Sequence, residues 1–142
     1  MKKTTEELMH EIQQFEQVED FLSENGEETC RLSLSEYLKA KLEERKLKKA
    51  DLFRKAGLVG SNYGYELFQN DHKVPSRDIL LSICLAFPLS IEETQYALRC
   101  CGLAVLYPRN IRDAYILFAI KNKTTIDELN DLLTENGHQT LL

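Results

Sequence analysis

The sequence predicts an all-α fold, and three observations carry this prediction. Apolar residues recur at helical spacing through almost the whole chain, and almost no stretch alternates as a strand would. Four Ser/Thr-x-x-Glu capping boxes stand just before such stretches, beginning at Thr4, Ser33, Ser90 and Thr125. The prolines fall only in the intervals between the stretches, at Pro75, Pro88 and Pro108.

These signals place nine helices near residues 5–15, 17–25, 33–46, 49–56, 60–69, 76–87, 90–101, 110–121 and 125–136. The first two form an acidic N-terminal appendage over residues 1–32, which holds nine acidic and three basic residues. A stretch rich in Gly and Glu at 25–31 separates this appendage from the rest. We expect a helix-turn-helix bundle over residues 33–106 and a C-terminal helical hairpin, packed on that bundle, over residues 107–142.

Residues 47–77 have the layout of a helix-turn-helix: a helix, a tight turn at Gly57, a second helix and a short basic loop. Gly57 follows the last periodic residue of the first helix, where a C-terminal cap requires positive φ. Two helices joined by so short a connection suit the angled pair that enters a DNA groove. Their facing stripes are apolar, and we expect these side chains to be mostly buried: Leu52, Phe53, Ala56, Tyr63, Leu67 and Phe68.

This segment resembles the lambda-repressor-like, or xenobiotic-response-element (XRE), class of helix-turn-helix proteins over about residues 33–101. The phrases YGYELFQN at 63–70, PSRD at 75–78 and YPRN-x-RDA at 107–114 are similar to those of a group of small bacterial regulators of that class. The resemblance implies a sequence-specific regulator of transcription that binds double-stranded DNA as a homodimer.

The candidate DNA contacts lie on the second helix and on either side of it. Amides such as those of Asn62 and Gln69 pair with adenine edges, and Glu66 accepts a hydrogen bond from a cytosine amine. Ser and Tyr hydroxyls reach phosphates, and basic side chains release counterions when they bind them. The full set of candidate contacts is Lys48, Lys49, Ser61, Asn62, Tyr63, Tyr65, Glu66, Gln69, Lys73 and Arg77.

The charge distribution favours DNA binding by this segment, whereas the second helix itself favours an alternative. Residues 33–87 carry ten basic and seven acidic residues, and the segments on both sides are net acidic within a chain of net charge −5. Residues 60–70, however, contain no Lys or Arg. The alternative is a protein-interaction adaptor that keeps the bundle without strong DNA binding. Its acidic N-terminal helices and C-terminal hairpin would then dock a protein partner.

An internal repeat with an offset of 35 residues covers the C-terminal half of the chain. The clearest matches pair Arg77-Asp78 with Arg112-Asp113, Leu98 with Leu133, and Gly102 with Gly137. We expect two helical hairpins, residues 76–106 and 111–141, that bury their apolar stripes on one another. The second hairpin holds more apolar residues than this contact needs, so we also expect it to offer a smaller face for a dimer.

Other function classes lack their sequence signals. The three histidines stand apart from any nucleophile context and no glycine-rich phosphate loop occurs, so we expect no enzymatic activity and no cofactor. The four cysteines show no metal-ligand spacing, which predicts reduced, mostly buried thiols and no metal site. No run approaches the roughly 20 apolar residues that span a bilayer, and no secretory signal is visible, so we expect a cytoplasmic protein without membrane contact.

Overall fold

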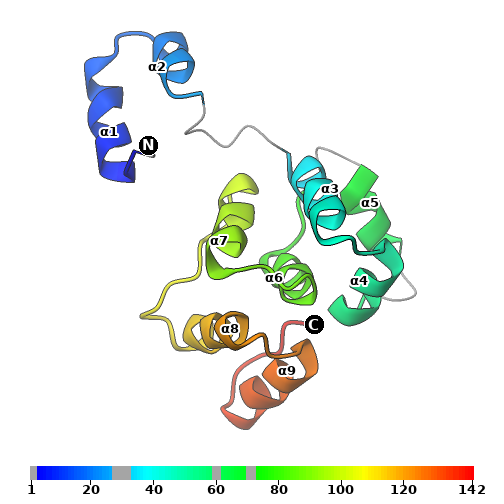
Figure 1. Cartoon of the computed structure of the whole chain (residues 1–142). Coiled ribbons are helices and arrows are strands. Elements are labelled where there is room, and N and C mark those ends of the chain that lie inside the picture. Colours follow the sequence, from blue (N-terminus) through cyan, green and yellow to red (C-terminus); the bar gives the residue numbers. More distant parts are fainter. Residues whose placement is uncertain (1–2, 27–32, 59–61, 70–72) are drawn as a thin grey trace. The chain divides into compact units, whose positions relative to one another are not determined.

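The computed structural model describes residues 3–26, 33–58, 62–69 and 73–142, and these residues form nine α-helices and no strand (Figure 1). Each helix lies within three residues of its predicted bounds, so the all-α prediction is confirmed. No helix among the described residues is long and apolar enough to cross a membrane. The helices are α1 (Thr5–Gln14), α2 (Val18–Glu24), α3 (Leu34–Arg45), α4 (Lys49–Ala56), α5 (Tyr63–Gln69), α6 (Arg77–Ala86), α7 (Ile91–Cys100), α8 (Ile111–Asn122) and α9 (Ile126–Glu135).

The predicted capping residues begin their helices as expected. The hydroxyl groups of Thr4, Ser33, Ser90 and Thr125 each accept a hydrogen bond from the backbone N–H three residues later. At α7 the box is complete, because the Glu93 carboxylate also accepts from the backbone N–H of Ser90. These caps satisfy N–H groups that the helix leaves without an internal partner, and therefore fix where each helix starts.

The chain divides into two compact units, residues 1–31 and 32–142. In the first, α1 and α2 form a small hairpin with Phe15 and Phe21 in edge-to-face contact, 6.0 Å between ring centroids. Lys3 forms an ion pair with Glu11 and donates a hydrogen bond to the Asn25 side chain. Both helices of this hairpin have no buried residue, which shows that the first unit is held mainly by local contacts.

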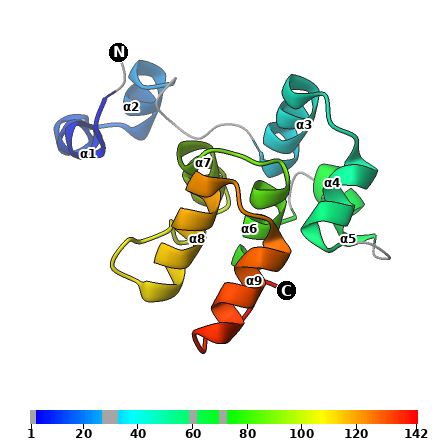
Figure 2. The same cartoon turned by 60° about the horizontal axis from the view of Figure 1, so that its bottom comes forward.

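In the second unit, α6 lies in the middle, with α3, α4 and α5 on one side and α8 and α9 on another (Figures 1 and 2). Every α6 residue from Leu80 to Ala86 is buried, as expected for a helix that is covered all round. Helix α4 packs on α6, and α5 packs on α3. Single residues of the core also come from the segments that follow α7 and α9, where Leu106 and Leu141 are buried.

The 35-residue repeat is confirmed by hydrogen bonds that recur at the same offset. The Gln95 side chain pairs with the backbone of Leu106, and Asn130 accepts a hydrogen bond from the N–H of Leu141 in the same place of the second copy. Both copies end their second helix at a glycine of positive φ, 67° at Gly102 and 75° at Gly137. Each copy is therefore a helical hairpin followed by a strap that folds back on it.

The two hairpins contact each other reciprocally. The Arg77 guanidinium forms two hydrogen bonds of 2.9 Å with the Asp113 carboxylate, and Arg112 forms two of 3.1 Å with Asp78. Likewise α6 packs on α9 while α7 packs on α8. When residue i meets j of the other copy and j meets i, the copies are related by a local two-fold axis. The repeat thus forms a closed pair rather than the start of an open solenoid, and the predicted contact between the hairpins is confirmed.

Candidate nucleic-acid interface

The C-terminal end of α4 is capped as the sequence predicts. Gly57 has a φ of 78° at the C-terminal end of α4, and its N–H donates to the carbonyl of Arg54. The N–H of Leu58 then donates to the carbonyl of Phe53 over 2.8 Å. These two bonds satisfy carbonyls at the helix end, a pattern that requires a left-handed residue and hence favours glycine. Helix α4 therefore ends abruptly at Gly57.

Helix α5 is seated by its rear face. The side chains of Leu67 and Phe68 are fully buried, and those of Leu52, Phe53 and Ala56 on α4 face the same core, as predicted. Phe53 lies in edge-to-face contact with both Tyr65 and Phe68, at centroid distances of 4.7 and 5.7 Å. These ring contacts fix α5 against α4 and determine which side of α5 faces outward.

Gly64 has a packing role that the sequence did not reveal. A β-carbon at this position would lie only 2.7 Å from Cε1 of Phe53. Glycine costs a helix about 1 kcal/mol relative to alanine, but here it lets the Phe53 ring approach the backbone of α5. The glycine inside α5 is thus explained by the close contact between α4 and α5.

The outward face of α5 is polar. The residues Asn62, Tyr65, Glu66 and Gln69 are all exposed, so four of the predicted groove contacts share one accessible side. Tyr63, which was expected to be mostly buried, packs against the edge of the core with part of its side chain accessible, and the Lys73 Nζ lies 4.4 Å from its ring centroid. Ser61 lies outside the described residues.

The predicted phosphate contacts separate into two groups. Lys48 is exposed at the start of α4, and Lys49 places its Nζ 5.2 Å from the centroid of Phe68; among the described residues neither ammonium group has an ion-pair partner. Lys73 instead forms an ion pair of 2.5 Å with Glu66 on the outward face of α5. Lys73 therefore offsets the one acidic side chain of this face and must exchange that partner to reach a phosphate.

Arg77 is a correction to the candidate set. Its guanidinium forms the bidentate pair with Asp113 and also donates to the carbonyls of Ala104 and Val105, over 2.9 and 3.1 Å. Four of its hydrogen bonds are thus directed into the repeat, and Arg77 connects α6 to the second hairpin rather than facing outward with α5. We therefore remove it from the phosphate contacts.

Part of the basic segment is also neutralised within the protein. Lys41 and Arg45 on α3 both form ion pairs with Glu93 at the start of α7. Partial burial alone would raise the pKa of Glu93, but the hydrogen bonds from Lys41 and from the Ser90 N–H, with the Arg45 charge, lower it to about 2. These two cations therefore connect α3 to α7 and contribute little to the positive field around α5.

Lys46 is a basic residue close to Lys48 in the sequence that the candidate set omitted. It is exposed at the C-terminal end of α3, two residues before Lys48, and has a φ of 53°. The signal that would have found it is the basic run at 45–49. Together, the exposed Lys46 and Lys48 and the half-buried Lys49 form a cationic segment between α3 and α4.

Metal ligands and cysteines were also candidates for chemistry in this chain. No three His, Cys, Asp or Glu side chains gather there as metal ligands. Cys84 is buried, and this burial raises the pKa of its thiol to about 12, while Cys100 and Cys101 are half-buried. Cys30 lies outside the described residues.

The chain matches no model of a known protein family, no curated protein and no solved structure. Its function must therefore be argued from the geometry of α4, α5 and their surroundings.

Proposed function

We propose that this chain is a lambda-repressor-like helix-turn-helix regulator of transcription that binds double-stranded DNA in a sequence-specific way. The observation that carries the proposal is the division of α5 into two faces. Its rear face is fully buried on α3 and α4, and its front face turns Asn62, Tyr65, Glu66 and Gln69 outward. A short helix held in this way presents polar side chains as a rigid row, which is what reading base edges in a major groove requires.

The roles of the side chains follow from their chemistry. Asn62 and Gln69, at opposite ends of the exposed row, pair with adenine, and Tyr65 donates its hydroxyl to the backbone. The cations Lys46, Lys48 and Lys49 contact phosphates, and Lys73 joins them when it leaves Glu66. Freed from Lys73, Glu66 accepts a hydrogen bond from a cytosine amine.

The test is a selection of bound sequences from a random duplex library, followed by fluorescence anisotropy on the selected and on unrelated duplexes. Asn62→Ala and Gln69→Ala should each cost about 1–3 kcal/mol on the selected duplex and leave unrelated duplexes unaffected. Lys48→Ala should weaken binding to both the selected and the unrelated duplexes. It should also lower by about one the slope of the logarithm of the affinity against the logarithm of the salt concentration, which we call the salt slope. Lys121→Ala on α8 is the matched control for loss of a lysine. Binding to no duplex at about 50 mM salt would exclude the proposal.

We further propose that the protein acts as a homodimer through the outer side of the second hairpin. Helix α8 is apolar on nearly every side, yet Ile111 is 67% and Phe118 61% exposed, and Leu132 on α9 and Tyr107 before α8 are exposed as well. A helix that is apolar all round is normally covered, so this face calls for a partner surface. A second copy would place two α5 helices on one duplex, as a two-fold related pair of half-sites requires.

Sedimentation of the full chain at several concentrations measures this association. Phe118→Asp should shift the chain to monomer with little change in its unfolding, because the ring is exposed in the single chain. Met9→Asp in α1, which is also exposed, is the control for adding a charge to an apolar surface. A chain that is monomeric at about 100 μM before any substitution would contradict the homodimer.

The protein-interaction adaptor remains the second candidate because of the Glu66–Lys73 ion pair. This pair neutralises a cation at the front of α5, so among the described residues Glu66 and Lys73 together offer DNA no net charge. If the chain binds no duplex and the α8 face captures a different protein, the adaptor function holds instead.

A further inference from the structure

The ion pair between Glu66 and Lys73 lies on the same face of α5 that the proposed function assigns to DNA. The Lys73 Nζ is 2.5 Å from Oε2 of Glu66 and 4.4 Å from the ring centroid of Tyr63. Tyr63 and Glu66 are three residues apart on α5, so they are neighbours on the surface of that helix. Two adjacent side chains of α5 therefore hold the ammonium group of Lys73.

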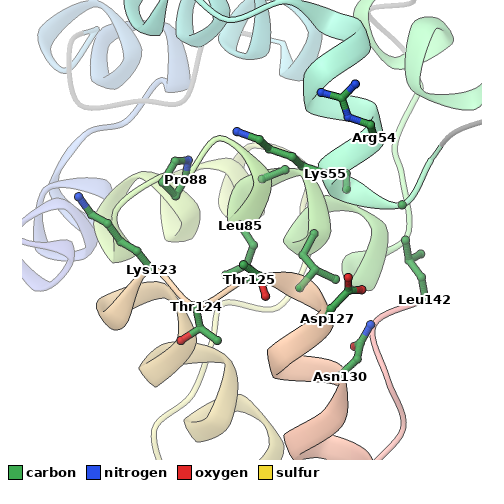
Figure 3. Close-up of a pocket in the computed structure, with 14 residues that line it drawn as sticks. Arg54, Lys55, Leu85, Pro88, Lys123, Thr124, Thr125, Asp127, Asn130 and Leu142 are labelled. Carbon is green, nitrogen blue, oxygen red and sulfur yellow. The ribbon is translucent and has the colours of Figure 1, made fainter.

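The basic side chains in the last turn of α4 serve another part of the structure. Arg54 forms an ion pair with Asp51, and both Arg54 and Lys55 line a groove of about 550 Å³ between α4, α6 and α9 (Figure 3). Among the described residues, the ion-pair partner of Glu66 is Lys73. This one pair therefore decides whether the acidic side chain on the front of α5 is neutralised by the protein or faces DNA uncompensated.

Opening the pair has opposite consequences for its two members. The pair itself is weak, because 52% of the Glu66 side chain is exposed, and opening such a pair lowers affinity by about fivefold or less. The freed ammonium group of Lys73 gains a phosphate and releases counterions. The freed carboxylate of Glu66 is repelled by phosphates, unless a cytosine amine in the major groove donates a hydrogen bond to it. Opening is therefore favourable only where the duplex places a cytosine opposite Glu66.

We propose that the Glu66–Lys73 pair determines specificity by staying closed on unrelated DNA and opening on the cognate sequence. On an unrelated duplex, Lys73 stays with Glu66, and the phosphates are contacted by Lys46, Lys48 and Lys49. On a duplex with a cytosine in register, the cytosine amine replaces Lys73 as the donor to Glu66, and Lys73 moves to a phosphate. The inference rests on the proposed function and adds that base readout by Glu66 and phosphate contact by Lys73 occur together.

The salt slope reports whether Lys73 is released, because each phosphate that the protein neutralises contributes about 0.9 to it. Fluorescence anisotropy of the full chain at about 50–200 mM salt gives this slope for the selected duplex and for an unrelated duplex. The slope should be steeper by about one on the selected duplex. When the C·G pairs of the selected duplex are replaced one at a time, one replacement should remove this extra slope together with part of the affinity.

Substitutions separate the pair from the other phosphate contacts. Lys73→Ala should lower the slope only on the selected duplex and so remove the difference, whereas Lys48→Ala should lower both slopes and keep it. Glu66→Gln should release Lys73 on every sequence. It should therefore raise the slope on the unrelated duplex by about one, and the affinity for that duplex about twofold to fivefold. Glu135→Gln, at an exposed position of α9, removes the same charge and should leave both slopes unchanged.

The outcomes distinguish this inference from the proposed function. Equal slopes of the parent chain on the two duplexes would overturn the inference and leave DNA binding intact. So would a difference in slope that survives Lys73→Ala, or an unchanged slope of Glu66→Gln on the unrelated duplex, provided that circular dichroism shows each variant to be folded. Binding to no duplex would exclude the proposed function and this inference with it.

Discussion

The pair of Arg77 with Asp113 gives the sharpest prediction about what holds the second unit together. The Asp113 side chain is only 8% exposed and that of Arg77 24%, and Asp113 accepts a further hydrogen bond of 2.9 Å from the N–H of Tyr107. Removing one partner from a buried ion pair costs about 3–5 kcal/mol, and a charged hydrogen bond contributes about 1.5–3 kcal/mol. Because Arg77 reaches solvent, we expect Arg77→Gln to lower the free energy of unfolding by about 2–4 kcal/mol.

The repeat provides an internal standard for this magnitude. Arg112 and Asp78 form the same pair through the same dipeptide, but their side chains are 20% and 30% exposed, and the two hydrogen bonds are longer. A charge that is left unpaired near water costs less than one left in the core. We therefore expect Arg112→Gln to cost about 1–2 kcal/mol, less than Arg77→Gln, although sequence alone makes the two residues equivalent.

Urea denaturation at pH 7, followed by far-ultraviolet circular dichroism, measures both costs. Combining Arg77→Gln with Asp113→Asn should give a coupling energy of about 1–2 kcal/mol in a double-mutant cycle. The same Arg77 variant, if folded, should keep the salt slope of DNA binding. A variant of native stability with a slope lowered by about one would refute this reasoning and return Arg77 to the phosphate contacts.

Two further predictions test the packing of α5 and the link between α3 and α7. Gly64→Ala should destabilise the protein by about 1–2 kcal/mol, although alanine has the better helix propensity, because the nearly buried Phe53 ring blocks the new methyl group. This loss of stability should be smaller in a Phe53→Leu background. A Gly64→Ala variant that is more stable than the parent protein would contradict the contact. Since the folded-state pKa of Glu93 is lowered to about 2, its stabilising effect is complete above about pH 5 and is lost as the pH falls toward 2. After allowance for solvent screening, this loss amounts to about 1–2 kcal/mol. Glu93→Gln retains the capping box. In urea titrations between pH 6 and 2.5, it should reduce the fall in the free energy of unfolding with falling pH. An unchanged pH dependence would exclude the ion pairs of Glu93 as the cause of that fall.

What the sequence determined by itself is local. The start of a helix depends on contacts between residues three apart, such as Ser90 with Glu93, and the buried side of a helix depends on the spacing of its apolar residues. Both the start of a helix and its buried side depend only on residues that are close together in the chain. For this reason the sequence could predict the helix bounds, the cap at Gly57 and the buried stripes of α4 and α5. It could also predict most of the exposed residues on the front face of α5. The repeat was also visible, because the same local signals occur twice.

What only the tertiary structure decided depends on residues far apart in the chain. Arg77 and Lys48 are both cations beside the same motif, yet Arg77 turns inward because Asp113, 36 residues later, lies within reach of its guanidinium. By helix propensity alone, Gly64 weakens α5, and only the position of the Phe53 ring against its backbone explains why a glycine is needed there. The groove is assembled from α4, α6 and α9, three segments that no local pattern connects. Burial and charge pairing are set by the whole fold, so the partner of each side chain had to come from the structure.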